Sequence, residues 1–154
     1  AVHAVFELLH GAQGCVFFGG VRGPHEVEVF EVGVAVVHHV VAGIPQAERC
    51  KRVQEGVAAD PGSFGIVLGG SGNGEQMAAN KVKGIRAALV WSIETAKLAR
   101  EHNNANVISI GGRMHSEEFC LELVDTFLAE SFPGDERHVR RVNLISKYER
   151  DGKL

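Results

Sequence analysis

The sequence predicts an α/β domain with a mainly parallel sheet. Three short apolar runs, at 64–68, 85–91 and 107–110, have the composition of buried strands. A helical pattern follows each run, and strands that alternate with helices are typical of a parallel sheet. The chain has 154 residues, a length that suits one domain with a single core. We therefore treat residues 1–154 as one domain.

The part of the chain after residue 58 has the clearest pattern. The strand at 64–68 ends in glycines, and residues 75–81 then have the composition of a helix start. After the strand at 85–91, Ser92 is placed to cap a helix that contains residues 95–99. The strand at 107–110 is followed by two further expected helices, at 116–128 and 135–148.

The first 57 residues have a weaker pattern. They suggest a helix at 6–9, a strand at 26–32 and a helix at 46–57. The chain opens almost directly on the first of these helices. The sequence therefore leaves open whether an initial strand of the sheet is missing.

Composition and charge exclude several classes of protein. The net charge is −3 and no long basic block is present, so nucleic-acid binding is not expected. Three cysteines without metal-ligand spacing indicate neither a disulfide framework nor a zinc site. The sequence contains no secretory signal and no run of about 18 apolar residues. We therefore expect a cytoplasmic protein with no membrane span.

The loops that follow the three strands are the expected place for chemistry. They are 69–75, 91–92 and 111–115. In a parallel sheet these loops leave from the same edge, at the carboxyl ends of the strands, where ligands collect in α/β folds.

The turn at 69–76 has the sequence Gly-Gly-Ser-Gly-Asn-Gly-Glu-Gln. Bare N–H groups in such a turn, beside a helix N-terminus, can bind an anion. A triphosphate loop needs Lys and then Ser or Thr where Glu75 and Gln76 stand, and the dinucleotide pattern lacks its last glycine. A carboxylate beside hydrogen-bond donors instead suits proton abstraction next to a carbonyl. A purely structural turn, with Glu75 as a helix N-terminal charge, fits the spacing equally well.

Long stretches after residue 58 form one set of motifs, at 59–63, 65–76, 78–82, 84–87, 99–105 and 110–115. The end of the chain adds Arg137-His138, Arg140-Arg141 and Tyr148-Glu149. Together these residues resemble the ribose-5-phosphate isomerase B family of sugar-phosphate isomerases, in particular its actinobacterial branch with glutamate as the base. The resemblance covers about the last two thirds of the chain. It implies a Rossmann-like, three-layer α/β/α fold and a homodimer or homotetramer with shared active sites.

The resemblance also implies an activity and site residues. The activity is the interconversion of ribose 5-phosphate and ribulose 5-phosphate, without a metal or an organic cofactor. Glu75 would be the base that moves a proton between C2 and C1, and His102 the acid that helps to open the sugar ring. The substrate-binding residues implied are His3, Gly70, Ser71, Gly72, Asn73, Gly74, Asn103, Arg113, Arg137 and Arg141.

The residues themselves support part of this assignment. Arg137 and Arg141 are four positions apart on an expected helix and so share a face, which suits a phosphate clamp or a solvated surface. His102 is placed as a helix C-terminal residue or as a catalyst. The adjacent His38 and His39 would point to opposite faces of a strand, so metal binding is not expected.

Residues 1–57 depart from the family. Val2 stands where the family has aspartate, Ile44 stands at its tyrosine, and no aspartate precedes Asp60. Replacing that aspartate removes a hydrogen-bond acceptor for the sugar. A shortened N-terminus, an incorrect sequence in this region and a homologue with impaired catalysis remain open. Three functions are therefore open: the isomerase of a five-carbon sugar phosphate, an isomerase of a six-carbon sugar 6-phosphate, or a sugar-phosphate-binding protein.

Overall fold

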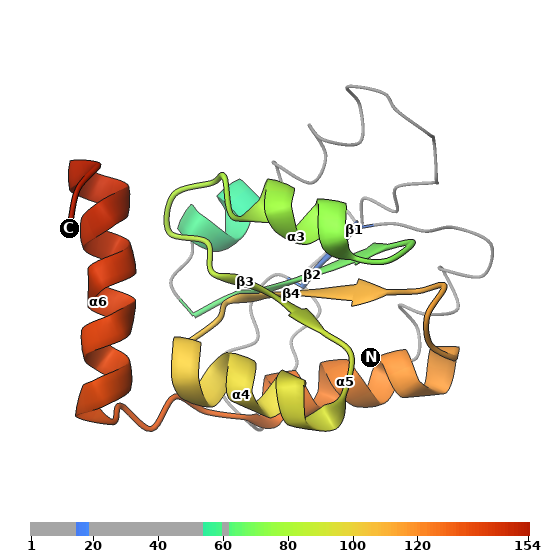
Figure 1. Ribbon diagram of the computed structural model, residues 1–154. Coiled ribbons are helices and arrows are strands. Elements are labelled where there is room, and N and C mark those ends of the chain that lie inside the picture. The colour runs from blue at the N-terminus through green and yellow to red at the C-terminus, as the bar shows by residue number, and fades with distance from the viewer. Residues whose placement is uncertain (1–14, 19–53, 60–61) are drawn as a thin grey trace.

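The computed structural model describes residues 15–18, 54–59 and 62–154, with the backbone alone at 15–18 (Figure 1). His3, the expected helix at 6–9 and the expected strand at 26–32 lie outside these residues. Of the helix expected at 46–57, the described part is helical over 54–59.

A four-stranded sheet in the order β1-β2-β4-β3 forms the centre of the described structure. The strands β2 (Phe64–Gly69), β4 (Val107–Gly111) and β3 (Ala87–Val90) pair in parallel, as the sequence predicts. The strand β1 (Cys15–Phe18) pairs antiparallel with β2 and was not expected from the sequence.

The strand β3 is shorter than the predicted strand at 85–91. The Asn80 side chain accepts a hydrogen bond from the N–H of Ala87 (2.9 Å), and the Asn106 side chain accepts one from the N–H of Arg86 (2.8 Å). Side chains therefore take these two N–H groups, while the carbonyl of Arg86 accepts from the N–H groups of Asn106 (3.2 Å) and Val107 (3.4 Å). Regular pairing with β4 begins only at Ala87.

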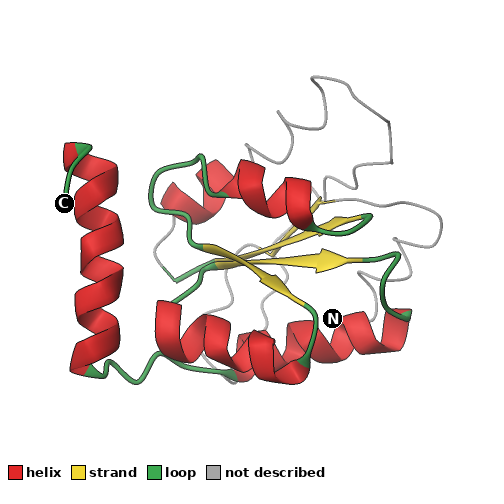
Figure 2. Ribbon diagram, viewed as in Figure 1, coloured by secondary structure: helices red, strands yellow, loops and turns green. Residues whose placement is uncertain are grey.

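Helices cover both faces of the sheet (Figure 2). The helix α3 (Asn73–Ala79) lies on one face, and α4 (Ile93–Asn103) and α5 (Glu117–Ala129) lie on the other. The helix α6 (Glu136–Asp151) passes the end of the sheet where the parallel strands begin. The expected three-layer α/β/α arrangement is thus confirmed. None of the described helices is both long and apolar enough to span a bilayer.

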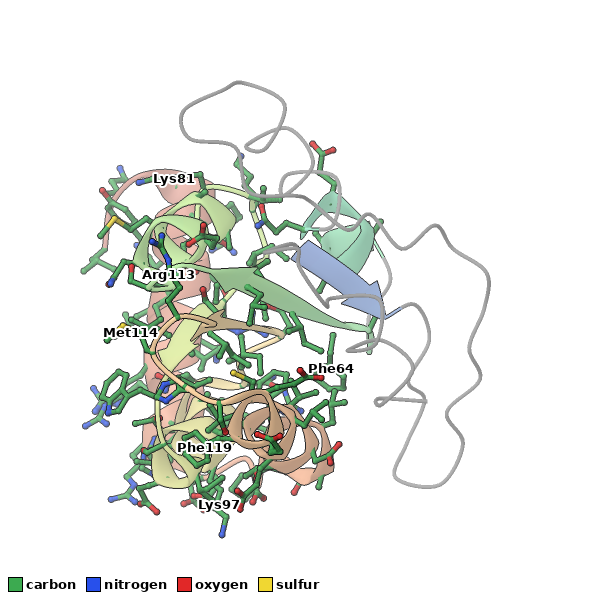
Figure 3. The ribbon with its side chains drawn as sticks, turned by 90° about the vertical axis from the view of Figure 1, so that its right-hand side faces the viewer. Phe64, Lys81, Lys97, Arg113, Met114 and Phe119 are labelled. Atoms are coloured by element: carbon green, nitrogen blue, oxygen red, sulfur yellow. The ribbon has the colours of Figure 1, made fainter. Side chains whose placement is uncertain are left out.

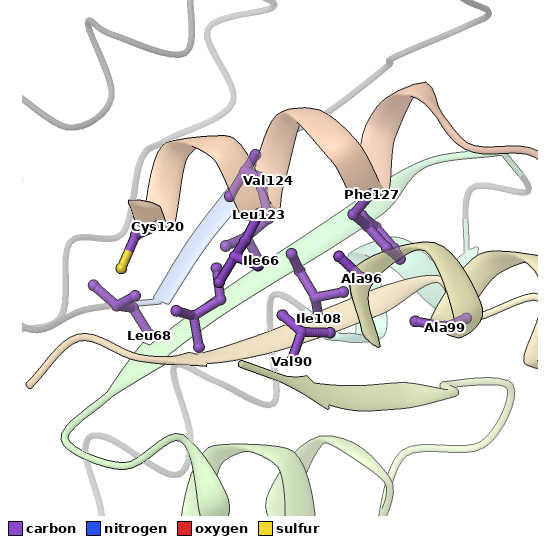
Figure 4. Close-up of a cluster of buried hydrophobic side chains, with 12 residues drawn as sticks. Ile66, Leu68, Val90, Ala96, Ala99, Ile108, Cys120, Leu123, Val124 and Phe127 are labelled. Atoms are coloured by element: carbon purple, nitrogen blue, oxygen red, sulfur yellow. The ribbon is translucent and has the colours of Figure 1, made fainter. Parts of the chain in front are cut away.

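Alternation along β2 and β4 divides the core between the two faces. Ile66, Leu68 and Ile108 face α4 and α5, where they pack with the fully buried Leu123 and Phe127 (Figure 4). On the other face a smaller cluster lies against α3: Val57, Val67, Ala79, Ile85, Ala87 and Val107. Because the sheet is buried on both sides, its strands read as nearly continuous apolar runs.

Local capping fixes where the helices begin. Ser92 accepts a hydrogen bond from the N–H of Thr95 (3.2 Å), and the Thr95 hydroxyl accepts one from the N–H of Ser92 (3.1 Å). This capping box confirms the expected helix start at Ser92. Ser116 caps α5 in a similar way.

Candidate active site

The glycine-rich turn connects the carboxyl end of β2 to the start of α3. Gly72 precedes the helix with φ 78°, a left-handed conformation that favours glycine. A Cβ added at Gly72 would lie 2.7 Å from Leu89 Cδ1 and 3.0 Å from the carbonyl carbon of Ile110. Both the conformation and the space around it therefore require glycine here.

The Glu75 side chain folds back over the turn from the first turn of α3. Its carboxylate lies against Gly69, in the space that a Cβ at position 69 would occupy. The side chain is half-buried. No hydrogen bond or ion pair joins this carboxylate to another of the described residues.

Arg113 has a matching relationship to the next glycine. Its guanidinium group lies where a Cβ on Gly70 would be. The N–H of Arg113 donates to the carbonyl of Gly70 (3.2 Å), and that of Gly112 donates to the carbonyl of Gly69 (2.8 Å). These bonds join the turn after β4 to the glycine turn. Figure 3 faces this edge of the molecule, with Arg113 beside Met114.

A buried serine of β4 also holds the glycine-rich turn in place. Ser109, in the middle of β4, is fully buried, and its hydroxyl donates to the carbonyl of Gly72 (2.7 Å). Ser109 lies in the strand predicted at 107–110, and no role was predicted for it. A single hydroxyl within a buried apolar strand was the signal, because a buried hydroxyl needs a hydrogen-bond partner.

The expected acid and phosphate ligands gather elsewhere. His102 lies in the last turn of α4, and Arg137 and Arg141 lie near the start of α6. The His102 ring stacks on the ring of His138, with centroids 4.2 Å apart and an interplanar angle of 11°. The Nε of Arg137 donates to Nε2 of His138 (3.1 Å).

Asn103 belongs to this second group. Its side-chain amide donates to the carbonyl of Leu98 (3.3 Å), and the residue is exposed. It lines a cavity of about 650 Å³ beside α6, together with Arg86, Tyr148 and Glu149. No residue of the glycine turn lines this cavity.

The two groups lie at opposite ends of the sheet. Glu75 and Arg113 lie where the parallel strands end. The helix α4 starts after β3 at that end and returns to the end where the strands begin, and so carries His102 away from the glycine turn (Figure 1). One chain by itself therefore does not bring the expected base and acid together.

Burial and nearby charges lower the pKa of His138. Loss of contact with water lowers the pKa of His138, and nearby His102, Arg137 and Arg141 lower it further, while Asp135 opposes them. Among the described residues, no three His, Cys, Asp or Glu side chains are grouped so that they could hold a metal ion. His38 and His39 lie outside those residues.

Comparison with known proteins identifies the family of this chain. The model of the ribose/galactose isomerase family matches residues 24–145, more than half of the chain. The chain belongs to this family. The fold of this chain is similar to that of solved structures of ribose 5-phosphate isomerases. Type B ribose 5-phosphate isomerase from Trypanosoma cruzi gives a TM-score of 0.65 at 37% identity, over 84% of this chain and 77% of the other.

Two further members of the ribose/galactose isomerase family are similar. The ribose-5-phosphate isomerase B of Mycobacterium leprae is 61% identical over 92 residues, which are 60% of this chain and 57% of the relative. The structure of ribose-5-phosphate isomerase B from Mycoplasma genitalium with bound ribulose-5-phosphate gives a TM-score of 0.65 at 42% identity. It covers 68% of this chain and 69% of the other. This chain thus matches only 57% of the length of its mycobacterial relative.

Proposed function

We propose that this protein is an aldose–ketose isomerase that interconverts ribose 5-phosphate and ribulose 5-phosphate through an enediolate. The observation that carries the proposal is the Glu75 carboxylate held against Gly69 at the lip of the glycine turn. Membership of the ribose/galactose isomerase family and the activity named for the similar mycobacterial relative support it.

Glu75 is the base in this mechanism. It removes the proton from C2 of the open-chain aldose and returns it to C1 of the enediolate. The proton of the C2 hydroxyl passes to the oxygen on C1, and the ketose results. Negative charge develops on the carbonyl oxygen during this transfer, and N–H groups of residues 70–74 stabilise it. Arg113, next to Gly70, binds the same part of the sugar.

His102 and the two arginines serve the other end of the substrate. His102 gives a proton to the ring oxygen O4 as the C1–O4 bond breaks, and the C1 hydroxyl loses its proton to water to form the aldehyde. Arg137 and Arg141 bind the phosphate, since guanidinium groups match its geometry and charge. Asn103 binds a sugar hydroxyl.

A second copy of the chain completes the site. Glu75 and His102 lie at opposite ends of one sheet, so the acid beside a given Glu75 comes from a neighbouring chain. The glycine-turn end carries apolar side chains that suit such a contact: Met77, Trp91 and Met114 are 62%, 59% and 67% exposed. We therefore infer a homodimer, alone or within a homotetramer.

The differences in residues 1–57 give reason to test a second function, sugar-phosphate binding without turnover. A coupled assay on ribose 5-phosphate, with galactose 6-phosphate and allose 6-phosphate as comparisons, tests both. We expect turnover of the five-carbon substrate. Faster turnover of a six-carbon substrate would correct the substrate. Saturable binding of ribose 5-phosphate without turnover, and without exchange of its C2 proton in deuterated water, would favour the binding function.

A further inference from the structure

His138 has no role in the mechanism above, yet its position is unusual. It is the buried residue of α6, whose 16 residues are all described, and is 3% exposed. Its neighbours Arg137 and Arg141 are exposed. A helix that presents mostly polar side chains thus buries an imidazole against α4, and places it flat against the His102 ring.

The hydrogen bond from Arg137 determines the protonation of this ring. Because Nε of Arg137 carries a hydrogen and donates it to Nε2 of His138, Nε2 must keep its lone pair. The single ring proton of a neutral imidazole is then on Nδ1. That atom is buried and has no hydrogen-bond partner among the described residues.

The charges around His138 oppose a second proton. The groups that act on it are His102 of α4, Arg137 and Arg141 of α6, and Asp135 just before α6. Three of the four are cationic or can become so. A proton on Nε2 would also remove the acceptor of the Arg137 hydrogen bond. These charges and the burial of the ring therefore lower the pKa of His138 and favour its neutral form.

A neutral ring is a favourable surface for an imidazolium ion. Two stacked imidazolium rings would repel each other, whereas a cation over a neutral aromatic face is attracted to it. At a centroid distance of 4.2 Å and an angle of 11°, His138 also limits the rotation of the His102 ring. The ring of an acid must point at the atom that it protonates.

We propose that His138 is a positioning residue for His102: held by Arg137 against the His102 ring, it orients that ring for protonation of the sugar ring oxygen. This inference rests on the proposed isomerase function. The same arginine is expected at the phosphate, so phosphate binding and orientation of the acid act through one side chain.

The test separates ring opening from proton transfer. Ribose 5-phosphate is cyclic, whereas ribulose 5-phosphate cannot close a five-membered ring because its C5 oxygen carries the phosphate. Exchange of a C1 proton of ribulose 5-phosphate in deuterated water therefore requires the base but not the ring-opening acid. Both rates are measured for the wild type, His138→Ala, His138→Phe and the surface control Lys147→Ala, which is on the same helix.

His138→Ala should lower kcat for ribose 5-phosphate on the order of tenfold, part of the 10²–10⁴ that a general acid contributes, and leave the C1 exchange rate unchanged. His138→Phe, which keeps a flat ring, should recover part of the loss. Lys147→Ala should match the wild type in both assays. Equal loss in both reactions, no loss in either, or a His138→Phe variant no better than His138→Ala would overturn the proposal.

A measurement on the wild type keeps the proposal testable if His138→Ala does not fold. Nitrogen NMR of the histidine rings at pH 7 should show His138 neutral, with its proton on Nδ1 and Nε2 as the acceptor of the Arg137 hydrogen bond. A proton on Nε2 of His138 at that pH would refute the proposal. A wild type inactive in both assays would contradict the proposed function instead, and the NMR result would still decide the state of His138.

Discussion

The carboxylate of Glu75 occupies the space that a side chain on Gly69 would need. The expected base is therefore placed by the absence of a neighbouring Cβ as well as by its own position on α3. Gly70 has the same relationship to Arg113. Two adjacent glycines thus determine where a carboxylate and a guanidinium group lie at the end of β2.

Gly69→Ala should remove activity without unfolding the protein. Gly69 has no positive φ, and the three atoms nearest to the added methyl all belong to the end of the Glu75 side chain, which can move away. We expect kcat to fall at least about tenfold, because a displaced general base loses part of its 10²–10⁴ contribution. The melting temperature should change little. A Gly69→Ala protein with wild-type kcat would show that the observed Glu75 position is not the active one.

Gly72→Ala, in contrast to Gly69→Ala, should lower the stability of the protein. The left-handed backbone and the contact with the Ile110 main chain allow no easy adjustment. We expect a loss of about 1 kcal/mol or more in the free energy of unfolding, since alanine is strained at positive φ. Urea denaturation of Gly69→Ala and Gly72→Ala side by side checks the contrast.

Ser109→Ala should loosen the glycine turn. It leaves the Gly72 carbonyl without its buried hydrogen bond, which costs about 1–3 kcal/mol. The exposed Ser131→Ala variant is the control and should be neutral. If urea denaturation gave the two variants equal stability, the Ser109–Gly72 bond would contribute nothing to the turn.

The shared site can be tested by mixing inactive chains. If Glu75 and His102 of one site come from different chains, a mixture of Glu75→Gln and His102→Asn should regain about a quarter of wild-type turnover, since half of randomly assorted dimers then hold one intact site of two. Glu75→Gln mixed with Arg113→Ala should regain none, because these residues lie at the same end of one chain. Equal behaviour of the two mixtures would contradict a shared site.

The buried His138 also predicts a pH dependence of stability. Its pKa is lowered in the folded protein, chiefly by burial, so the unfolded chain binds the proton more readily. Above the unfolded-state pKa of about 6.5, His138 therefore does not change the free energy of unfolding. Below that pH it lowers the free energy of unfolding progressively. The melting temperature should fall more between pH 7 and 5.5 for the wild type than for His138→Phe. Parallel curves would mean that His138 titrates normally.

The sequence was most informative where structure depends on near neighbours. The cap at Ser92 was predicted from its position just before a helical pattern, although the reciprocal bond with Thr95 was not. The strands β2 and β4 and the loops at their carboxyl ends were also predicted, because apolar runs between glycines describe buried parallel strands.

Contacts between distant residues could not be predicted in the same way. The start of β3 depends on Asn80, which bonds Ala87 from the end of α3, and on Asn106, which bonds Arg86 from the loop before β4. The stack of His102 on His138 depends on how α6 returns to α4. The separation of Glu75 from His102 follows from the direction in which α4 crosses the sheet. The identities of the site residues alone do not reveal that direction.

The most direct test of the account follows solvent deuterium into C1 of ribulose 5-phosphate. The wild-type protein and Glu94→Gln, a change at an exposed glutamate of α4, should incorporate deuterium at similar rates. Glu75→Gln should be slower by at least about 100-fold, the contribution expected of a general base. Undiminished incorporation by Glu75→Gln would show that another group removes the proton.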